Sequence, residues 1–408
     1  MAGERLAAPG PPSALKGCER MVRRRSAGST AVTATAITLG AAAFGGLVGL
    51  ATLTVYVARR VVTPSKTRVE DLRILGSTET TITLSKTLDT LLPGRYGLWF
   101  SEGAGHARIG PILEVGNRFV VRELIGVDHG DLATATRGSV AGWFFLEPSE
   151  LGFAFEEVEI ETPVGVAPAW LIPARRGSKR WLIGVHGRGV RRQECLRAVA
   201  VARECGYTSL LVSYRNDGDA PQSNDGLYGL GDTEWPDVDA ALAYAIARGA
   251  TEVVLMGWSM GGAISLQVVT RSANAGVVNG VILESPVVNW IDTINYQTDA
   301  LRVPRIVSIG AQRVIGAPWG RTLTGQDEAI DLARLNFVAR ADELDLPILI
   351  LHSADDGYVP ASASQQLALA RPDIVTFDEF TIARHAKLWN YDPERFNRDI
   401  RRWLKRLR

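Results

Sequence analysis

Two patterns of hydrophobic and polar residues follow one another along the 408-residue chain. Over residues 61–150, short alternating segments are separated by glycine-rich breaks, which is typical of a small β-rich domain. Its expected strands are Thr80–Leu84, Arg95–Phe100, Ile112–Val115, Arg118–Ile125 and Val140–Leu146. Over residues 156–408, apolar runs alternate with segments of helical period, which predicts βαβ units. The expected fold class is therefore α/β, with a mostly parallel sheet covered by helices on both faces.

The expected elements of this second region follow one another at regular spacing. A hairpin is followed by six strands: Val158–Thr162 and Ala169–Ile172, then Trp181–His186, Thr208–Ser213, Val253–Met256, Val281–Leu283, Leu346–Leu351 and Ile374–Phe380. Five helices are expected between and after them: Glu194–Cys205, Thr233–Arg248, Ala263–Thr270, Ser362–Ala370 and Pro393–Leu407. Residues 286–344 are irregular and partly helical. Because ligands of such sheets bind at the carboxyl ends of the strands, the chemistry is expected there.

The N-terminal region has a different composition. Residues 1–30 are rich in alanine, glycine, proline and arginine, and we expect a disordered basic tail. Residues 31–58 contain no charged residue and are long enough to span a bilayer. Because Arg59 and Arg60 follow directly, an uncleaved membrane anchor is favoured over a signal peptide, and a buried core helix is the alternative. Basic residues are balanced across the segment, and we expect a single-pass protein of the cell membrane with the region after the segment extracytoplasmic.

Composition narrows the function classes. A net charge of +1 and the absence of any recognised motif give no indication of nucleic-acid binding. Three cysteines make neither a disulfide framework nor a metal cluster, and no sequence motif indicates a cofactor. Cys195 and Cys205 fall on one expected helix, about 15 Å apart, and are interpreted as buried inert thiols. His106 and His129 look isolated in the β-rich region and are interpreted as surface or packing residues.

The most informative motif is Gly257-Trp258-Ser259-Met260-Gly261, between an apolar strand and an expected helix. A serine in such a strand-to-helix turn is held in a strained conformation with its hydroxyl exposed, and glycines on both sides avoid collisions. The helix N-terminus beneath it favours developing negative charge. The sequence therefore predicts Ser259 as a nucleophile.

A base and an acid are expected after the serine in this arrangement. His385, just after the last expected strand, is the candidate base. Asp356 is the candidate acid because Asp-x-x-Val-Pro follows the strand Leu346–Leu351, while Asp355 is interpreted as its solvated neighbour. Glu284 is an outside alternative. The acid would orient the imidazole and stabilise its charged form.

Two backbone donors are expected to stabilise the oxyanion. One is the N–H of Met260, directly after the nucleophile. The other is the N–H of Arg188, in the turn His186-Gly187-Arg188-Gly189 that follows a strand. His186 is interpreted as a structural residue of that turn.

These motifs resemble the α/β-hydrolase superfamily, over residues 156–408. Tyr214-Arg215-Asn216, and His385-x-x-x-Trp389 followed by Asp392-Pro393, are similar to its serine aminopeptidase and prolyl-oligopeptidase-like branch. Asn216 stands where that branch has glycine. The resemblance implies that residues 286–344 form a cap over the substrate pocket.

The sequence thus predicts a serine hydrolase that cleaves a carboxylic ester through an acyl-enzyme, acting on a small-molecule or peptide acyl substrate. A peptidase or amidase of the same fold is the main alternative, and an acyltransferase is a third. A membrane-anchored binding protein that kept the scaffold and lost turnover is the alternative from another class. The loop 217–235 is either a wall of the pocket or a solvated connection. The oligomeric state stays open.

Overall fold

The computed structural model describes residues 46–65 and 67–407. The expected basic tail, and the part of the expected anchor up to residue 45, lie outside the described residues. The chain divides into two compact units, Met1–Thr54 and Val55–Arg408.

A helix covers residues 46–62. Among the helices of the described residues, none combines the length and the hydropathy needed to cross a bilayer. The C-terminal end of this helix belongs to the second unit, where Ala58 and Val62 are fully buried. The carbonyl of Val62 accepts a hydrogen bond from the Tyr228 N–H at 2.8 Å. The chain is therefore fixed to the second unit directly before the β-rich region starts.

The β-rich region is a closed six-stranded barrel with the order β1-β2-β5-β4-β3-β6. Its strands are β1 Leu72–Ser77, β2 Thr81–Ser85, β3 Tyr96–Phe100, β4 Gly105–Val115, β5 Phe119–His129 and β6 Arg137–Ala141. Alternating residues such as Ile82, Leu98 and Ile109 fill its interior.

Several expectations for the barrel were wrong. β1 was not predicted, and β4 begins seven residues earlier than expected. β6 starts three residues before the expected segment Val140–Leu146 and overlaps only its first two residues. Some glycines that were interpreted as breaks between strands lie inside strands. Glycine is needed at these positions because a neighbouring residue occupies the space that a side chain would fill. A Cβ at Gly105 would lie 2.1 Å from the Phe100 ring, and one at Gly138 would lie 2.7 Å from the Trp99 carbonyl oxygen.

The interpretation of His106 and His129 as isolated residues was also wrong. They are cross-strand partners in β4 and β5, and both rings lie beside Trp99. Nδ1 of His106 donates to Asp128 at 2.7 Å. Burial lowers the pKa of His106, although the hydrogen bond to Asp128 opposes this shift.

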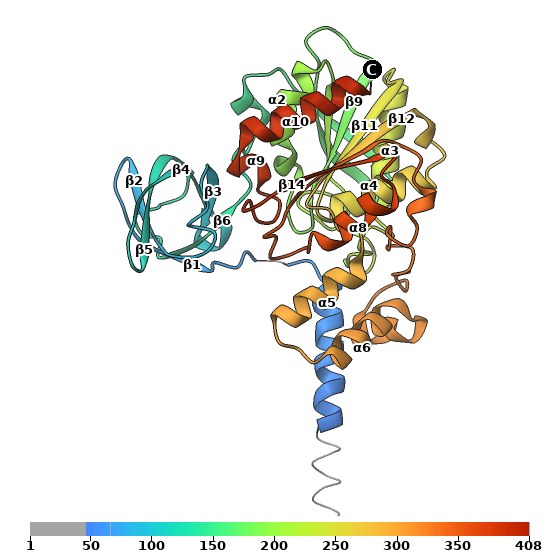
Figure 1. Cartoon of the computed structure of the whole chain (residues 1–408), viewed down its shortest axis with the longest axis horizontal. Helices are drawn as coiled ribbons and strands as arrows, with labels where there is room; N and C mark the ends of the chain where they lie inside the picture. The colour runs from blue at the N-terminus through green and yellow to red at the C-terminus, as the bar shows by residue number, and fades with distance from the viewer. Residues whose placement is uncertain (1–45, 66, 408) are drawn as a thin grey trace, which may run out of the picture. The chain divides into compact units, whose positions relative to one another are not determined.

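The second region forms an eight-stranded sheet in the order β14-β13-β12-β11-β9-β10-β8-β7 (Figure 1). The strands are β7 Glu156–Thr162, β8 Gly165–Ile172, β9 Arg180–Val185, β10 Thr208–Val212, β11 Glu252–Trp258, β12 Val278–Glu284, β13 Ile348–Ser353 and β14 Val375–Phe380. β9 to β14 are parallel, and the hairpin β7–β8 adds antiparallel strands at one edge. The expected doubly covered parallel sheet is confirmed.

Helices cover both faces of this sheet (Figure 1). One core packs α3 Trp235–Ala247, α4 Met260–Arg271 and α8 Ser362–Ala370 against residues such as Ile183 of β9. The other core packs α2 Leu196–Glu204, α9 Leu388–Tyr391 and α10 Pro393–Arg406 against Leu182 of the same strand. Consecutive residues of a strand face opposite sides of the sheet, and here both sides are buried. The strands are therefore continuously apolar instead of alternating between apolar and polar residues.

Residues 286–344 form a separate helical segment, which we call the cap. It contains α5 Trp290–Ala300, α6 Arg305–Gly316, α7 Arg321–Thr324 and the short 3-10 turns Pro318–Gly320 and Ala341–Glu343. Two further 3-10 turns, Arg192–Cys195 and Ala275–Val277, lie beside the sheet. The remaining two, Ser101–Gly103 and Pro148–Leu151, lie within and after the barrel.

Candidate active site

Ser259 occupies the turn between β11 and α4, at the carboxyl edge of the sheet. Its backbone has φ 50° and ψ −116°, a conformation that L-residues rarely adopt. A Cβ at Gly257 would lie 2.4 Å from the Gly261 carbonyl oxygen, and one at Gly261 would lie 2.1 Å from the Val185 carbonyl oxygen. The two glycines are therefore required for the turn to close.

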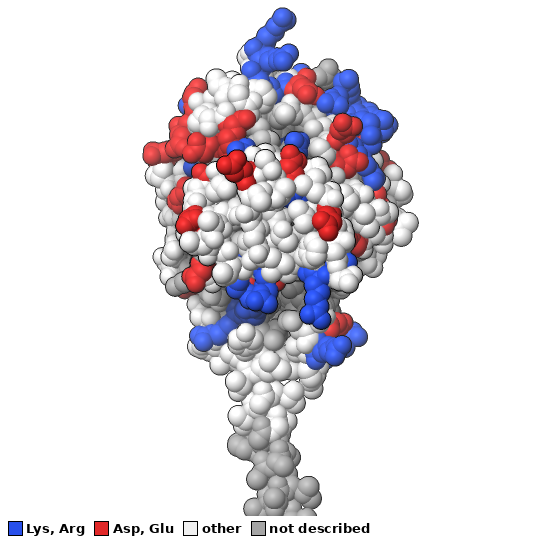
Figure 2. All heavy atoms as spheres, turned by 90° about the vertical axis from the view of Figure 1, so that its left-hand side faces the viewer, with Lys and Arg blue, Asp and Glu red and all other residues white. Residues whose placement is uncertain are grey.

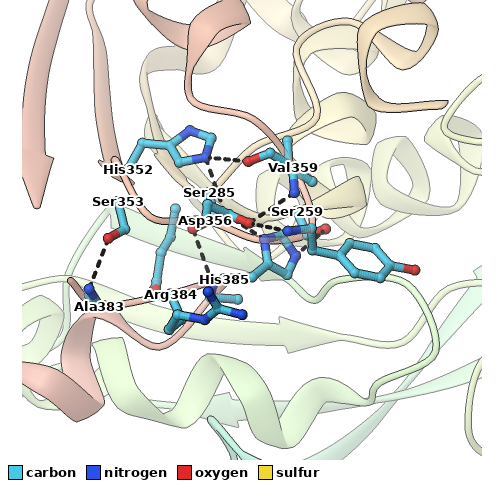
Figure 3. A network of polar contacts seen from close by, with 12 residues as sticks. Ser259, Ser285, His352, Ser353, Asp356, Val359, Ala383, Arg384 and His385 are labelled. Carbon is cyan, nitrogen blue, oxygen red and sulfur yellow. Dashed lines mark hydrogen bonds and ion pairs between the residues drawn. The ribbon is translucent and has the colours of Figure 1, made fainter. Parts of the chain in front are cut away.

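The structure brings Ser259, His385 and Asp356 together (Figure 3). The Ser259 hydroxyl lies 3.0 Å from Nε2 of His385, although 126 positions separate the residues. Nδ1 of the same ring donates to Oδ2 of Asp356 at 2.7 Å. Both distances suit proton transfer from the hydroxyl to an imidazole oriented by a carboxylate.

The loop that carries His385 is held in an unusual conformation. The residues on either side of the histidine have positive φ values, 60° for Arg384 and 50° for Ala386. The Arg384 N–H donates to the Asp355 carboxylate at 2.9 Å, and the Ala386 N–H donates to Ser285 Oγ at 3.1 Å. The interpretation of Asp355 as a solvated neighbour was wrong, because this carboxylate fixes the backbone beside His385.

Asp356 is buried, and its carboxylate is fully engaged. Oδ1 accepts the N–H groups of Tyr358 and Val359 at 2.8 and 2.9 Å, while Oδ2 accepts from two histidines. Burial alone would raise the pKa of this carboxyl, but the charge of His385 and the hydrogen bonds from both histidines hold it well below its usual range. Asp356 is therefore ionised at neutral pH.

His352 is the second of these histidines, and sequence reasoning did not assign it a role. Its Nε2 donates to Asp356 Oδ2 at 3.2 Å and to the Val359 carbonyl at 3.1 Å, while Nδ1 accepts from Ser364 at 2.9 Å. Figure 3 shows His352 and His385 approaching the carboxylate from different sides. The available signal was its position at the end of β13, four residues before Asp356.

Glu284, the alternative acid, is engaged elsewhere. Its buried carboxylate accepts the indole N–H of Trp258 and, at 3.0 Å, the N–H of Leu388. It supports the strand before the serine and the start of α9, and it has no hydrogen bond to His385.

The turn at Arg188 is braced from both sides. The N–H of Gly187 donates to Glu194 at 2.7 Å, and the N–H of Gly189 donates to Asp217 at 3.2 Å. A Cβ at Gly187 would lie 3.3 Å from that of Ser259, so this turn adjoins the serine. Within the described residues, the N–H of Arg188 has no acceptor. Its side chain turns away and donates to the carbonyls of Arg60 and Thr63.

The backbone N–H of Met260 and the buried ring of His186 also lie at this edge of the sheet. Met260 is the first residue of α4, so its N–H has no acceptor inside the helix. His186 stacks on Tyr214 with ring centroids 4.2 Å apart, and burial lowers its pKa to about 4. A neutral, buried imidazole in this position fits a structural role.

The loop 217–235 is partly exposed and partly packed against the protein. Asp217, Tyr228 and Leu230 are buried, and the Tyr228 hydroxyl donates to Asp217. Asn216 has φ 72°, the left-handed conformation that glycine adopts readily, so asparagine preserves the turn. Its amide also donates to the Leu227 carbonyl at 2.7 Å.

The cap contacts the segment that carries the acid. The Tyr296 hydroxyl donates to the Asp356 carbonyl at 3.2 Å, and the Gln297 amide donates to the Tyr358 carbonyl at 2.8 Å. The ring of Tyr358 in turn lies 5.2 Å from that of His385. In the part of the chain that the structure describes, no cluster of three or more His, Cys, Asp or Glu residues could hold a metal ion.

Solved structures with the same fold include an esterase from Pyrococcus furiosus at 18% identity. That match covers 64% of this chain and 94% of that chain, with a TM-score of 0.50. An esterase from Rhodococcus sp. matches at 20% identity, 62% and 99% coverage and a TM-score of 0.44. At 18% identity the likeness to the Pyrococcus furiosus esterase shows the fold alone. None of the curated proteins compared matches the chain.

Family models match both regions of the chain. Residues 73–141, the barrel, match a domain of unknown function (DUF8805). Residues 182–399, more than half of the chain, match the family described as "Alpha/beta hydrolase family". This match agrees with the parallel sheet, with the strained turn at Ser259, and with the hydrogen bonds that link Ser259 to His385 and His385 to Asp356. The chain belongs to the alpha/beta hydrolase family.

Proposed function

We propose that the protein is a serine hydrolase that cleaves a carboxylic ester through an acyl-enzyme. Ser259 Oγ attacks the acyl carbonyl while Nε2 of His385 accepts its proton. His385 returns this proton to the leaving alcohol, and a water molecule activated by the same nitrogen then releases the acid. Asp356 keeps the ring oriented and stabilises its charged form.

The observation that carries this proposal is the continuous hydrogen-bonded path from Ser259 through His385 to Asp356. The N–H groups of Met260 and Arg188 are the proposed oxyanion donors, and loss of one such donor typically costs about 10²–10³-fold in rate. Support for Arg188 comes from the braces on Gly187 and Gly189, which fix the donor before substrate arrives.

The ester is proposed because the Pyrococcus furiosus protein that shares the fold is described as an esterase. The resemblance of the Tyr214 and C-terminal motifs to the serine aminopeptidase branch keeps a peptidase as the alternative. Both reactions use the same three side chains, and they differ in the leaving group that His385 must protonate.

Hydrolysis of p-nitrophenyl esters and of aminoacyl p-nitroanilides by the purified protein tests the proposal. We expect a much larger kcat/KM for a short-chain ester than for any anilide, and a loss of at least about 10⁴-fold in Ser259→Ala. Preference for an anilide would favour the peptidase. No turnover of either class, with Ser259→Ala indistinguishable from the parent, would favour a binding protein.

Attachment to a lipid bilayer through residues 31–58 is a further part of the proposal. Its support is the absence of any charged residue in this stretch and the arginines that follow it. The catalytic domain would then lie at the extracytoplasmic surface. Flotation of the full chain with vesicles after a carbonate wash tests the attachment, and complete release by the wash would contradict it.

A further inference from the structure

We propose that the outer surface of the cap docks on the surface of an anionic lipid bilayer. This surface, which we call the cap face, is formed by the exposed side chains of residues 301–323. It is separate from the polar groups around Ser259, and its proposed ligand is the phospholipid headgroup layer. The inference rests on the proposed membrane attachment and is independent of the chemistry at Ser259.

The cap face exposes large apolar side chains within a short stretch. Leu301 is 70% exposed, Ile306 67% and Trp319 60%, and Ile309 and Leu323 are also exposed. A single exposed leucine is ordinary on a soluble surface, but such a group in 23 residues indicates a surface that is covered by another partner.

Two of these residues, Ile306 and Ile309, lie on α6 but outside its buried side. Ala311, Val314 and Ile315 are buried on its inner side and join the helix to the core. Ile306 and Ile309 lie on the opposite side and contribute nothing to that core. A helix with one apolar side already buried would normally carry only polar residues on the other.

Charge identifies the kind of partner. Residues 301–323 contain four arginines, Arg302, Arg305, Arg313 and Arg321, and no acidic residue, and the exposed Asp299, Asp327 and Glu328 lie outside this stretch. All four are exposed, and none has an ion pair within the described residues. Figure 2 shows blue side chains in the lower part of that view, with the red side chains gathered mainly above them. Apolar side chains with arginines beside them, and a tryptophan between them, are typical of surfaces that lie in the headgroup region.

The cap also starts close to the point where the chain leaves the uncharged segment. Ala58, the last residue of that segment, and Val62 are buried in the second unit. The Val62 carbonyl binds Tyr228, and two residues further the Leu230 carbonyl accepts the indole N–H of Trp290 at 2.7 Å. Since Trp290 begins α5, the loop that carries Tyr228 and Leu230 contacts both the chain after Ala58 and the start of the cap.

The experiment places an environment-sensitive NBD label on the cap face of the full chain. A Cys18→Ser background removes the cysteine outside the described residues, while Cys195 and Cys205 are buried. Ile306→Cys carries the label, and Leu369→Cys is the matched control. Leu369 is 80% exposed but lies at the end of α8, which returns the chain to the amino edge of the sheet, away from the cap.

Both proteins are reconstituted into vesicles that contain phosphatidylglycerol and brominated phosphatidylcholine. We expect a blue shift and strong quenching of the label at position 306, neither effect at position 369, and a marked reduction when the four arginines are replaced by glutamine. Water-like emission at position 306 in vesicles that retain the protein would overturn the inference. A blue shift that lipid bromination leaves unquenched would assign the cap face to a protein partner or a second copy. Protein that fails to remain with the vesicles would instead refute the membrane attachment.

Discussion

The backbone of Ser259 adopts φ 50°, and the residues around it lack side chains where a side chain would collide. Strain of this kind costs about 1–3 kcal/mol at one residue and persists only where the surrounding structure enforces it. Here the strain places the hydroxyl at the end of the sheet. The loop of His385 shows the same feature, since its two flanking residues also have positive φ values.

Gly261→Ala tests the tight packing at this turn. An added Cβ would lie 2.1 Å from the Val185 carbonyl oxygen, so the strand or the helix must shift. We expect the free energy of unfolding to fall by about 3 kcal/mol, measured by urea denaturation. Gly276→Ala is the control, because nothing lies within 4 Å of its Cβ position, and we expect a change below about 1 kcal/mol. Equal effects at the two positions would contradict the packing argument.

Asp217 gives a prediction about pH. Burial raises its pKa to about 7 in the folded protein, against 3.8 for an exposed aspartate, although hydrogen bonds from Tyr228 and Gly189 oppose this shift. The folded state therefore binds the proton more tightly, and this contribution to stability is complete below about pH 4 and lost as the pH rises to about 7.

Comparison with Asp217→Asn isolates this contribution, because other titrating groups are common to both proteins. The free energy of unfolding of the parent, relative to the variant, should fall between about pH 4 and 7 by at most about 1.4 kcal/mol per pH unit. It should be level above that range. Urea titrations at several pH values measure it, and a difference that stays constant with pH would refute the raised pKa.

At the level of single residues, sequence motifs indicated Ser259, His385 and Asp356, which the structure brings into hydrogen-bonding distance. The partners that hold them were not predictable. Glu194 and His352 act through contacts that depend on how separate elements pack, and no local pattern encodes such contacts. The choice between Asp355 and Asp356 rested on spacing, which says nothing about the backbone that Asp355 binds.

The four-residue helix α9 contacts segments that lie far from it in the sequence. The Asn390 side chain donates to the carbonyls of Arg95 and Gly142, and it accepts from the Arg197 guanidinium at 2.8 Å. A single buried amide therefore joins the barrel, the segment after it and the helix α2. This explains why such a short helix is buried throughout most of its length.

Asn390→Ala should be strongly destabilising, because it leaves a buried guanidinium and two carbonyls with one partner fewer. We expect a loss of about 2–4 kcal/mol in the free energy of unfolding, followed by urea denaturation. Asn397→Ala on α10 is the control, because its Oδ1 has no hydrogen-bond partner among residues 46–65 and 67–407. A loss below about 1 kcal/mol at position 390 would show that the amide is not the joint between these elements.

The elements of the parallel sheet were predicted to within a few residues, because strands buried on both faces must be continuously apolar. The barrel was predicted less well. Its strands have one exposed face, and β4 contains several irregularities in its pairing with β5, which disturb the alternation from which strands are recognised. The helix α9 was missed because four residues are too few to show a period.

For the whole molecule, the decisive feature is that parallel strands end at one edge of the sheet. Ser259 follows β11, Asp356 follows β13 and His385 follows β14, so three distant segments meet without any local contact between them. The order of the strands along the chain predicted that these three segments lie close together at the edge of the sheet. The sequence could not predict that the cap would bind the acid segment, or that the helix ending at residue 62 would pack beside Tyr228, since both depend on tertiary contacts between irregular segments.

Covalent labelling with a fluorophosphonate, followed by peptide mapping by mass spectrometry, tests the central claim most directly. The reagent reacts with a serine only where a neighbouring base makes its hydroxyl nucleophilic. We expect one adduct per chain, located on Ser259, with none in Ser259→Ala and greatly slowed labelling in His385→Ala. A folded parent protein that gains no adduct, or gains one at another residue, would contradict the assignment of Ser259 as the nucleophile.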